Sequence, residues 1–225
     1  MIRINKPKFG AISTLALAVL FIIGLVSSTA VPAIAQPLAS EKTSGLAYHD
    51  EWRKLWEDHI TWTRVVIMGI LNELPGTGAY VDRLLQNYVD MEEALEPYYG
   101  ADAEVLGDLI RDHLVIAAEI LNAANEGDNT RLNEAIALWY ANAEDIAVQM
   151  NRMNPKFWPL DESRQMWIDH LDATLEEATA HLSGDFEREV AAYDLIHELA
   201  LEMADFISAG VIRQFPEKFM GGVPR

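Results

Sequence analysis

Apolar residues recur every three or four positions from Tyr48 to the end of the chain, and no segment there alternates apolar and polar residues as a strand would. Gly and Pro are confined mostly to short clusters that separate segments of helical length. The chain contains no cysteine, so no disulfide can hold it together and the fold depends on its apolar core. The sequence therefore predicts an all-α protein.

The clusters of helix-breaking residues divide this region into six helices. We expect them over residues 49–74, 79–95, 102–125, 130–153, 161–183 and 185–214. Asn129 or Thr130 is expected to cap the fourth helix and Asp161 the fifth. The prediction is a six-helix bundle of three helical hairpins, forming one domain over residues 48–219. A flexible leader over 36–47 and a frayed tail over 220–225 are expected to flank it.

A dipeptide of aspartate and histidine occurs three times at nearly even spacing, which indicates an internal repeat. The three pairs are Asp58-His59, Asp112-His113 and Asp169-His170. Three residues before each histidine stands a large apolar residue, and four residues after it a small one. These neighbours share a helical face with the histidine, so each imidazole is expected to face the core. The aspartate lies about 100° round the helix and cannot easily bond to the ring beside it.

The second helix of each predicted hairpin carries two polar residues one turn apart. These are Asn87 with Asp90, Asn142 with Asp145, and Asp194 with His197. Residues spaced by three share a face, so each pair can present two polar groups to one point. If the hairpins share one core, the histidines and these groups converge there. Histidine and carboxylate side chains that converge in a helical bundle are typical of a metal site or a buried proton site.

We therefore hypothesise a transition-metal site among the repeated polar residues. Its candidate ligands are His59, His113, His170, His197, Asp90 and Asp145, with Asn87, Asn142 and Asp194 in support. Without cysteine, a thiolate site and a covalent c-type haem are excluded. Nitrogen and oxygen ligands suit Zn, Ni, Cu(II), Mn or non-haem Fe, and this choice stays open. The alternative is a buried polar network that only fixes how the hairpins dock.

Strict catalytic motifs are absent from the sequence. There is no H-E-x-x-H, no glutamate three residues before any histidine, no glycine-rich phosphate loop and no G-x-S-x-G. The sequence favours a binding protein over an enzyme and leaves catalysis open. We expect His49, His181 and the pair Glu176-Glu177 at the surface, and the tryptophans of the first helix in the core.

The chain begins with the pattern of a secretory signal peptide. Three basic residues precede an uncharged apolar run over 11–26, and Ala33-Ile34-Ala35 has the small-x-small form of a cleavage site. We expect cleavage after Ala35 and a mature protein in a secreted or periplasmic, cell-envelope location. The alternative is an uncleaved membrane anchor, for which the run is short.

The charge of the chain is strongly negative. It carries 17 basic and 35 acidic residues, a net charge of −18, and removal of residues 1–35 with their three basic residues gives (17 − 3) − 35 = −21. Such a field repels nucleic acid and attracts cations. Nucleic acid is therefore excluded as an expected partner, and cations are plausible ones.

The string Leu55-Trp56-Glu57-Asp58-His59-Ile60-Thr61-Trp62-Thr63-Arg64 resembles a family of extracytoplasmic all-helical proteins with an LWxDHxxWTR motif. The segments 83–87, 112–113 and 214–219 extend the resemblance over most of the predicted mature chain. The family has no established activity, so the resemblance implies a single extracytoplasmic helical domain and no site. Two functions remain: a transition-metal-binding protein, or a non-enzymatic binding or interaction domain whose polar core is structural.

Overall fold

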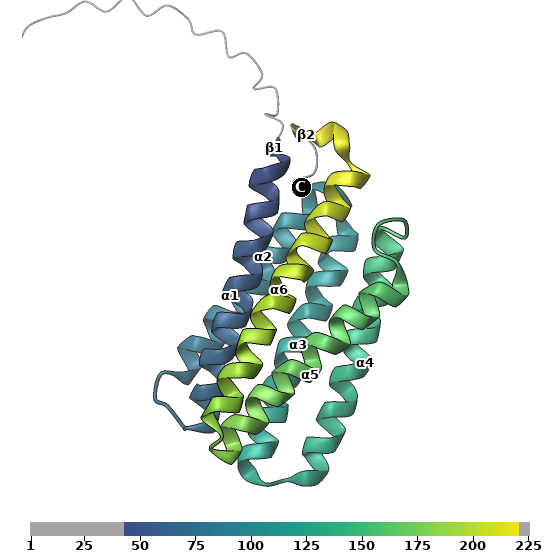
Figure 1. The fold of residues 1–225 in the computed structure, drawn as a ribbon. Helices are drawn as coiled ribbons and strands as arrows, with labels where there is room; N and C mark the ends of the chain where they lie inside the picture. Colours follow the sequence, from purple (N-terminus) through teal and green to yellow (C-terminus); the bar gives the residue numbers. More distant parts are fainter. Residues whose placement is uncertain (1–42, 221–225) are drawn as a thin grey trace, which may run out of the picture. The chain divides into compact units, whose positions relative to one another are not determined.

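The structure, a computed structural model, describes residues 43–220. The predicted signal peptide therefore lies outside the described residues, as do residues 36–42 of the predicted leader and 221–225 of the predicted tail. Six long helices make up almost all of the described chain (Figure 1). They are α1 (Gly45–Leu71), α2 (Thr77–Tyr99), α3 (Ala101–Glu126), α4 (Asn129–Met153), α5 (Leu160–Ser183) and α6 (Phe186–Gln214). The prediction of an all-helical bundle with six helices is confirmed.

Each helix packs against the next one along the chain, and α6 returns to pack against α1, which closes the bundle (Figure 1). A short 3-10 helix, η1 (Pro216–Lys218), follows α6. The strands β1 (Thr43–Ser44) and β2 (Phe219–Met220) then pair in parallel, with Thr43 opposite Phe219. The first and last described segments therefore lie side by side. No helix within residues 43–220 is long and apolar enough to cross a membrane.

The expected boundaries of the leader and tail were wrong where the structure describes them. Residues 43–47 form β1 and the first turn of α1 instead of a flexible leader, and Met220 pairs with Ser44 instead of fraying. The cause is apolar packing: Tyr48 is buried and its ring contacts those of Tyr98 and Phe219. This aromatic contact holds the two ends of the described chain together.

Two predicted helix caps were also wrong. The N-cap of α4 is Asp128, whose carboxylate accepts hydrogen bonds from the backbone N–H groups of Thr130 and Arg131. Asp161 caps nothing; it lies in the first turn of α5 after the N-cap Pro159 and pairs with Arg164. Its charge still favours the positive end of the helix dipole.

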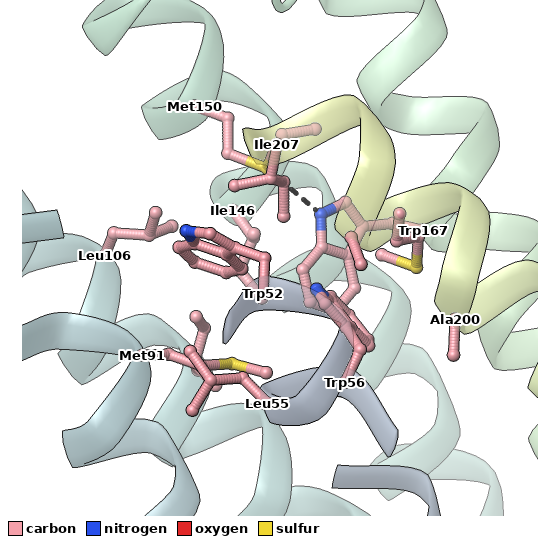
Figure 2. Packing of buried hydrophobic residues seen from close by; sticks show 14 of the residues in the cluster. Trp52, Leu55, Trp56, Met91, Leu106, Ile146, Met150, Trp167, Ala200 and Ile207 are labelled. Atoms are coloured by element: carbon pink, nitrogen blue, oxygen red, sulfur yellow. Dashed lines mark hydrogen bonds between the residues drawn. The ribbon is translucent and has the colours of Figure 1, made fainter. Parts of the chain in front are cut away.

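The main core is rich in tryptophan. Trp52, Trp56, Trp139, Trp158 and Trp167 are all buried in it. Figure 2 shows Trp56 and Trp167 packed against each other where α1 meets α5, with ring centroids 5.9 Å apart. The expectation that the first-helix tryptophans belong to the core is confirmed for Trp52 and Trp56, whereas Trp62 is half-buried in a second apolar cluster.

Candidate functional site: a buried three-histidine cavity

Three histidines meet in the interior of the bundle, one each from α1, α3 and α5. His59, His113 and His170 are only 2%, 1% and 2% exposed. The ring of His170 lies 5.7 Å from that of His59 and 6.3 Å from that of His113, measured between centroids. The residues three positions earlier, Trp56, Ile110 and Trp167, are buried as well, so each helix turns the same face inward.

Two of these histidines are held by asparagines in the same way. His59 Nδ1 lies 3.0 Å from Oδ1 of Asn87, and the amide of Asn87 donates to the carbonyl of Leu55, four residues before the histidine. His113 Nδ1 lies 3.2 Å from Oδ1 of Asn142, whose amide donates to the carbonyl of Leu109, again four residues earlier. One hydrogen-bonding unit therefore occurs twice.

These bonds determine the tautomer of each ring. Because the asparagine NH2 donates to a carbonyl, its oxygen is the atom that faces the histidine. Nδ1 of His59 and of His113 must then carry the hydrogen, which leaves the lone pair on Nε2 free. A ring fixed through Nδ1 with a free Nε2 lone pair is how many metal-binding histidines are prepared.

Burial also keeps the rings neutral. It lowers the pKa of His59 to about 4, although the hydrogen bond to Asn87 opposes the shift. The pKa of His113 falls to about 3, first through burial and then through the proximity of His59. Burial lowers the pKa of His170 well below its ordinary value, with the other two histidines adding to the effect. All three rings are therefore uncharged at neutral pH.

His170 lacks the asparagine that holds the other two. Within residues 43–220 no hydrogen-bond partner reaches its Nδ1, which is buried. The polar residues predicted at this place on α6 are elsewhere: Asp194 is exposed, and His197 is half-exposed and pairs with Glu57. A buried imidazole nitrogen without a partner is rare, because it loses its bond to water and gains none.

The three histidines line one small cavity of about 40 Å³. Two threonines at the +4 positions, Thr63 and Thr174, also line it, and most of the other lining residues are aliphatic. Thr174 donates its hydroxyl to the carbonyl of His170, whereas Thr63 Oγ1 has no partner within the described chain. The cavity exceeds the roughly 10–15 Å³ that one water needs, so it can take a small occupant.

The other predicted ligands do not join this group. Asp90 is bonded to Gln86 on the outer side of α2, and Asp145 is exposed on α4. The inclusion of Asp90, Asp145 and His197 beside the three histidines is thus corrected. Each lies one turn from an inward-facing residue, and the inward stripe of its helix is too narrow to bury both. In residues 43–220, no three His, Asp or Glu groups are already placed to hold a metal ion.

The aspartates of the repeated dipeptide are also away from the rings. Asp58 accepts from Arg83, and Asp112 from Arg111. Asp169 accepts from the side chain of Gln165 one turn earlier. They bind neighbouring side chains rather than the histidines, as their angle round the helix requires.

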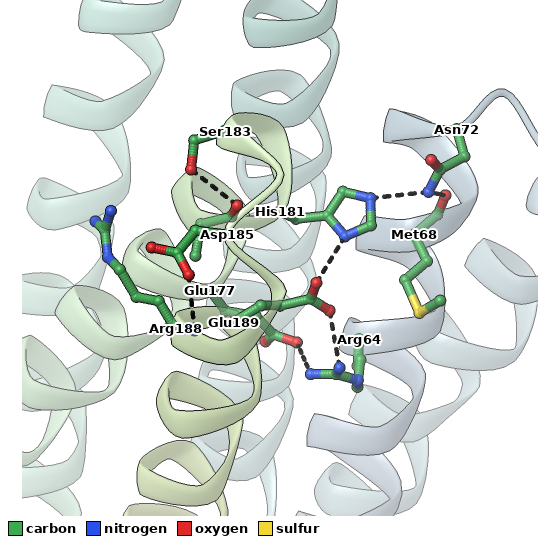
Figure 3. Close-up of polar contacts among 10 residues, drawn as sticks. Arg64, Met68, Asn72, Glu177, His181, Ser183, Asp185, Arg188 and Glu189 are labelled. Carbon is green, nitrogen blue, oxygen red and sulfur yellow. Dashed lines mark hydrogen bonds and ion pairs between the residues drawn. The ribbon is translucent and has the colours of Figure 1, made fainter.

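A second polar cluster, the Arg64 network, joins α1, α5 and α6 (Figure 3). Arg64 donates to Glu177 over 2.6 Å and to Glu189 over 2.8 Å, and Nδ1 of His181 lies 3.0 Å from the other oxygen of Glu189. The amide of Asn72 lies 2.9 Å from Nε2 of His181 and also donates to the carbonyl of Met68. A neutral His181 with its hydrogen on Nδ1 satisfies all of these bonds.

Sequence reasoning missed the Arg64 network. Glu177 and Glu189 are 1% and 5% exposed, and His181 is largely buried, so their expected surface positions were wrong for Glu177 and His181. Burial raises the pKa of Glu177 to about 7, against the opposing effect of Arg64. The partners of Arg64 are more than 100 residues away in the chain, so no local spacing reveals them.

Comparison with known proteins adds no identity to this arrangement. No protein-family model, no curated protein and no solved structure matches the chain. The function is therefore inferred from the site itself.

Proposed function

We propose that this chain is an extracytoplasmic transition-metal-binding protein that holds its ion in the three-histidine cavity. The observation that carries the proposal is the meeting of three neutral, buried imidazoles from three helices at one small cavity. Neutral imidazole is the form of histidine that binds metal. The low pKa values of His59 and His113 keep that form available even in mild acid.

The asparagines support this function as orienting residues. Asn87 and Asn142 fix the hydrogen on Nδ1, so that Nε2 is the donor atom left for an ion. An ion bound tetrahedrally by all three rings would require them to draw together, because imidazoles on one tetrahedral ion have centroids about 5 Å apart. The observed separations from His170 are 5.7 and 6.3 Å, so shifts of about an ångström would bring His170 to that distance from each of the other two rings.

We also propose that the three histidines arose from an internal repeat of three helical hairpins. The unit of histidine, asparagine and carbonyl occurs in α1–α2 and again in α3–α4. The third hairpin keeps His170 and lacks the asparagine. According to this proposal, the third hairpin lost the asparagine that orients the histidine in the other two, so that the ring of His170 can move toward an ion.

The location proposed is the secreted or cell-envelope space, and it rests on residues 1–35. Their basic start, apolar run and A-x-A site support export with cleavage after Ala35. The resulting charge of −21 would concentrate cations near the protein surface.

Elemental analysis tests the proposal. The protein is purified without a histidine tag, beside a His59→Ala, His113→Ala, His170→Ala triple variant, and both are shown to be helical by circular dichroism. The expected result is near-stoichiometric transition metal in the protein, before or after reconstitution, and its loss from the triple variant. A His197→Ala variant, altered at a half-exposed histidine, serves as the matched control and should keep the metal.

The second candidate function is a non-enzymatic interaction domain whose polar core is structural. It is favoured by the complete bonding of Nδ1 in His59 and His113 and by the absence, within residues 43–220, of a ready-made ion site. The two candidates differ in their response to metal. A bound ion raises the melting temperature by mass action, whereas the melting temperature of a protein with a purely structural network does not change with metal or chelator.

A further inference from the structure

The cavity offers an ion nitrogen donors and no negative charge. Among the described residues that line it, the polar side chains are three neutral histidines and two threonines, and no carboxylate is present. The free energy needed to bury an ion in an apolar site grows with the square of its charge, so a divalent ion costs about four times as much as a monovalent one. The lining therefore disfavours a divalent ion that brings no anion with it.

The spacing of the rings fits a low coordination number. Two imidazoles that bind one ion from opposite sides, with bonds of about 2 Å, have ring centroids about 6 Å apart. His170 lies 5.7 Å from His59 and 6.3 Å from His113, so its pairs have this separation as they stand. Of the three rings, His170 is also the one whose buried Nδ1 has no hydrogen-bond partner in the described part of the chain.

We infer that the ion held by the cavity is Cu(I), bound by His170 together with His59 or His113. This inference rests on the proposed function and specifies its ligand. Cu(I) is monovalent, accepts two or three ligands without bound water and binds well to neutral imidazole. The divalent ions Zn(II) and Ni(II) require more ligands or an accompanying anion, which this lining does not provide.

Competition titrations test the inference. The protein is titrated anaerobically with Cu(I) against a chromophoric Cu(I) chelator, and in separate experiments with Zn(II) and Ni(II) against indicators for those ions. Ag(I) serves as a monovalent probe that needs no reductant. We expect one Cu(I) or Ag(I) per chain, with an affinity at least about a hundredfold higher than that for Zn(II) or Ni(II).

Two single variants locate the ion. His170→Leu removes the ring and keeps an apolar side chain of similar size, so the fold should survive; it should weaken Cu(I) binding at least about a hundredfold. His197→Ala should leave binding unchanged. Circular dichroism and urea unfolding confirm that both variants are folded.

The outcomes separate the inference from the proposed function. If Zn(II) or Ni(II) binds through His170 as tightly as Cu(I), the choice of Cu(I) is wrong and the metal-binding function stands. If no ion binds at the three histidines, both fail. Cu(I) binding that survives His170→Leu would overturn the assignment of the ligand.

Discussion

A buried ring nitrogen of His170 has no partner among residues 43–220, and an unpaired buried polar group costs about 1–3 kcal/mol of folding stability. His59 and His113 avoid this cost because Asn87 and Asn142 accept their Nδ1 hydrogens. A histidine kept at a cost to stability is more readily explained by a ligand than by packing. The proposed ion site would account for the contrast between His170 and the other two rings, which a purely structural network would leave unexplained.

The first prediction follows from this contrast. Without metal, His170→Leu should raise the free energy of unfolding by about 1–3 kcal/mol, because it removes an unsatisfied nitrogen and keeps the packing. His113→Leu is the matched control and should lower it, because Asn142 then loses its hydrogen-bond donor. Urea unfolding measures both. A His170→Leu protein less stable than the parent would show that the ring is structural.

The orienting asparagines give the second prediction. Asn142→Ala should lower the free energy of unfolding by about 2–4 kcal/mol, since Nδ1 of His113 and the carbonyl of Leu109 both lose their buried partners. Asn133→Ala, at an exposed position on the same helix, should change it by less than about 0.5 kcal/mol. Equal effects in urea unfolding would refute the role given to Asn142.

Spacing along the chain could reveal part of the site. The repeated dipeptide located His59, His113 and His170, and the polar pairs included Asn87 and Asn142 as supporting residues. Spacing could not decide which members of these pairs face inward, because residues three apart both lie within one broad helical face. That choice depends on how closely the neighbouring helix approaches. The packing places Asn87 and Asn142 inside, Asp90 and Asp145 outside, and both members of the third pair, Asp194 and His197, outside.

At the scale of the helices, the three turns that end α1, α3 and α5 share one backbone arrangement. In each, two successive N–H groups bond back to carbonyls three and five residues earlier: from 73 and 74, from 127 and 128, and from 184 and 185. This is the Schellman motif, which needs a left-handed backbone conformation at the first of the two residues that donate these bonds. Gly127 and Gly184 meet that need with φ of 71° and 73°, whereas Glu73 adopts φ 52° with a side chain.

Glu73 therefore gives a prediction for the first turn. Glu73→Gly should raise the free energy of unfolding by about 1 kcal/mol, because a left-handed conformation costs a non-glycine residue about 1–2 kcal/mol. Gly127→Ala, the reverse change at the equivalent position, should lower it by a similar amount. Thermal unfolding of the two variants checks this. A destabilising Glu73→Gly would mean that the glutamate side chain contributes more than its backbone strain costs.

Most helix boundaries could be predicted because glycine and proline mark them. The predicted ends of α4, α5 and α6 match the structure, and that of α3 is within one residue. The end of α2 was wrong, since the helix continues through Pro97 to Tyr99. A proline in the last turn sacrifices only one hydrogen bond near the helix end. Beyond this proline, Tyr98 packs on Phe215 and Phe219, and Tyr99 packs on Trp158. No local sequence pattern indicates these contacts.

For the whole molecule, the buried titratable groups link stability to pH in two opposite senses. The histidines have folded pKa values below the unfolded value of about 6.5, so unfolding takes up protons and stability is lost as pH falls below about 6.5. Glu177 has a raised folded pKa of about 7, so it opposes this trend between about pH 4.5 and 7. Because three histidines reduce stability as the pH falls and one glutamate increases it, the net effect in mild acid is a loss of stability.

The fourth prediction is a steep loss of stability in mild acid. Metal-free protein should lose about 2–3 kcal/mol per pH unit between about pH 6 and 4.5, which corresponds to a net uptake of about two protons. His170→Leu should reduce that slope by about 1.4 kcal/mol per pH unit, the equivalent of one proton. Urea unfolding at several pH values measures both slopes. A flat profile over this range would show that the rings are already charged or reach solvent.

The most direct measurement is a long-range proton–nitrogen NMR spectrum of the histidine rings at pH 7, recorded without metal and after one equivalent of Ag(I) or Zn(II). We predict neutral rings with hydrogen on Nδ1 for His59 and His113, and a shift of the Nε2 signals of at least one of them, together with a ring nitrogen of His170, when the preferred ion is added. Charged rings before addition, or shifts confined to His49, His181 and His197, would contradict an ion site in the three-histidine cavity.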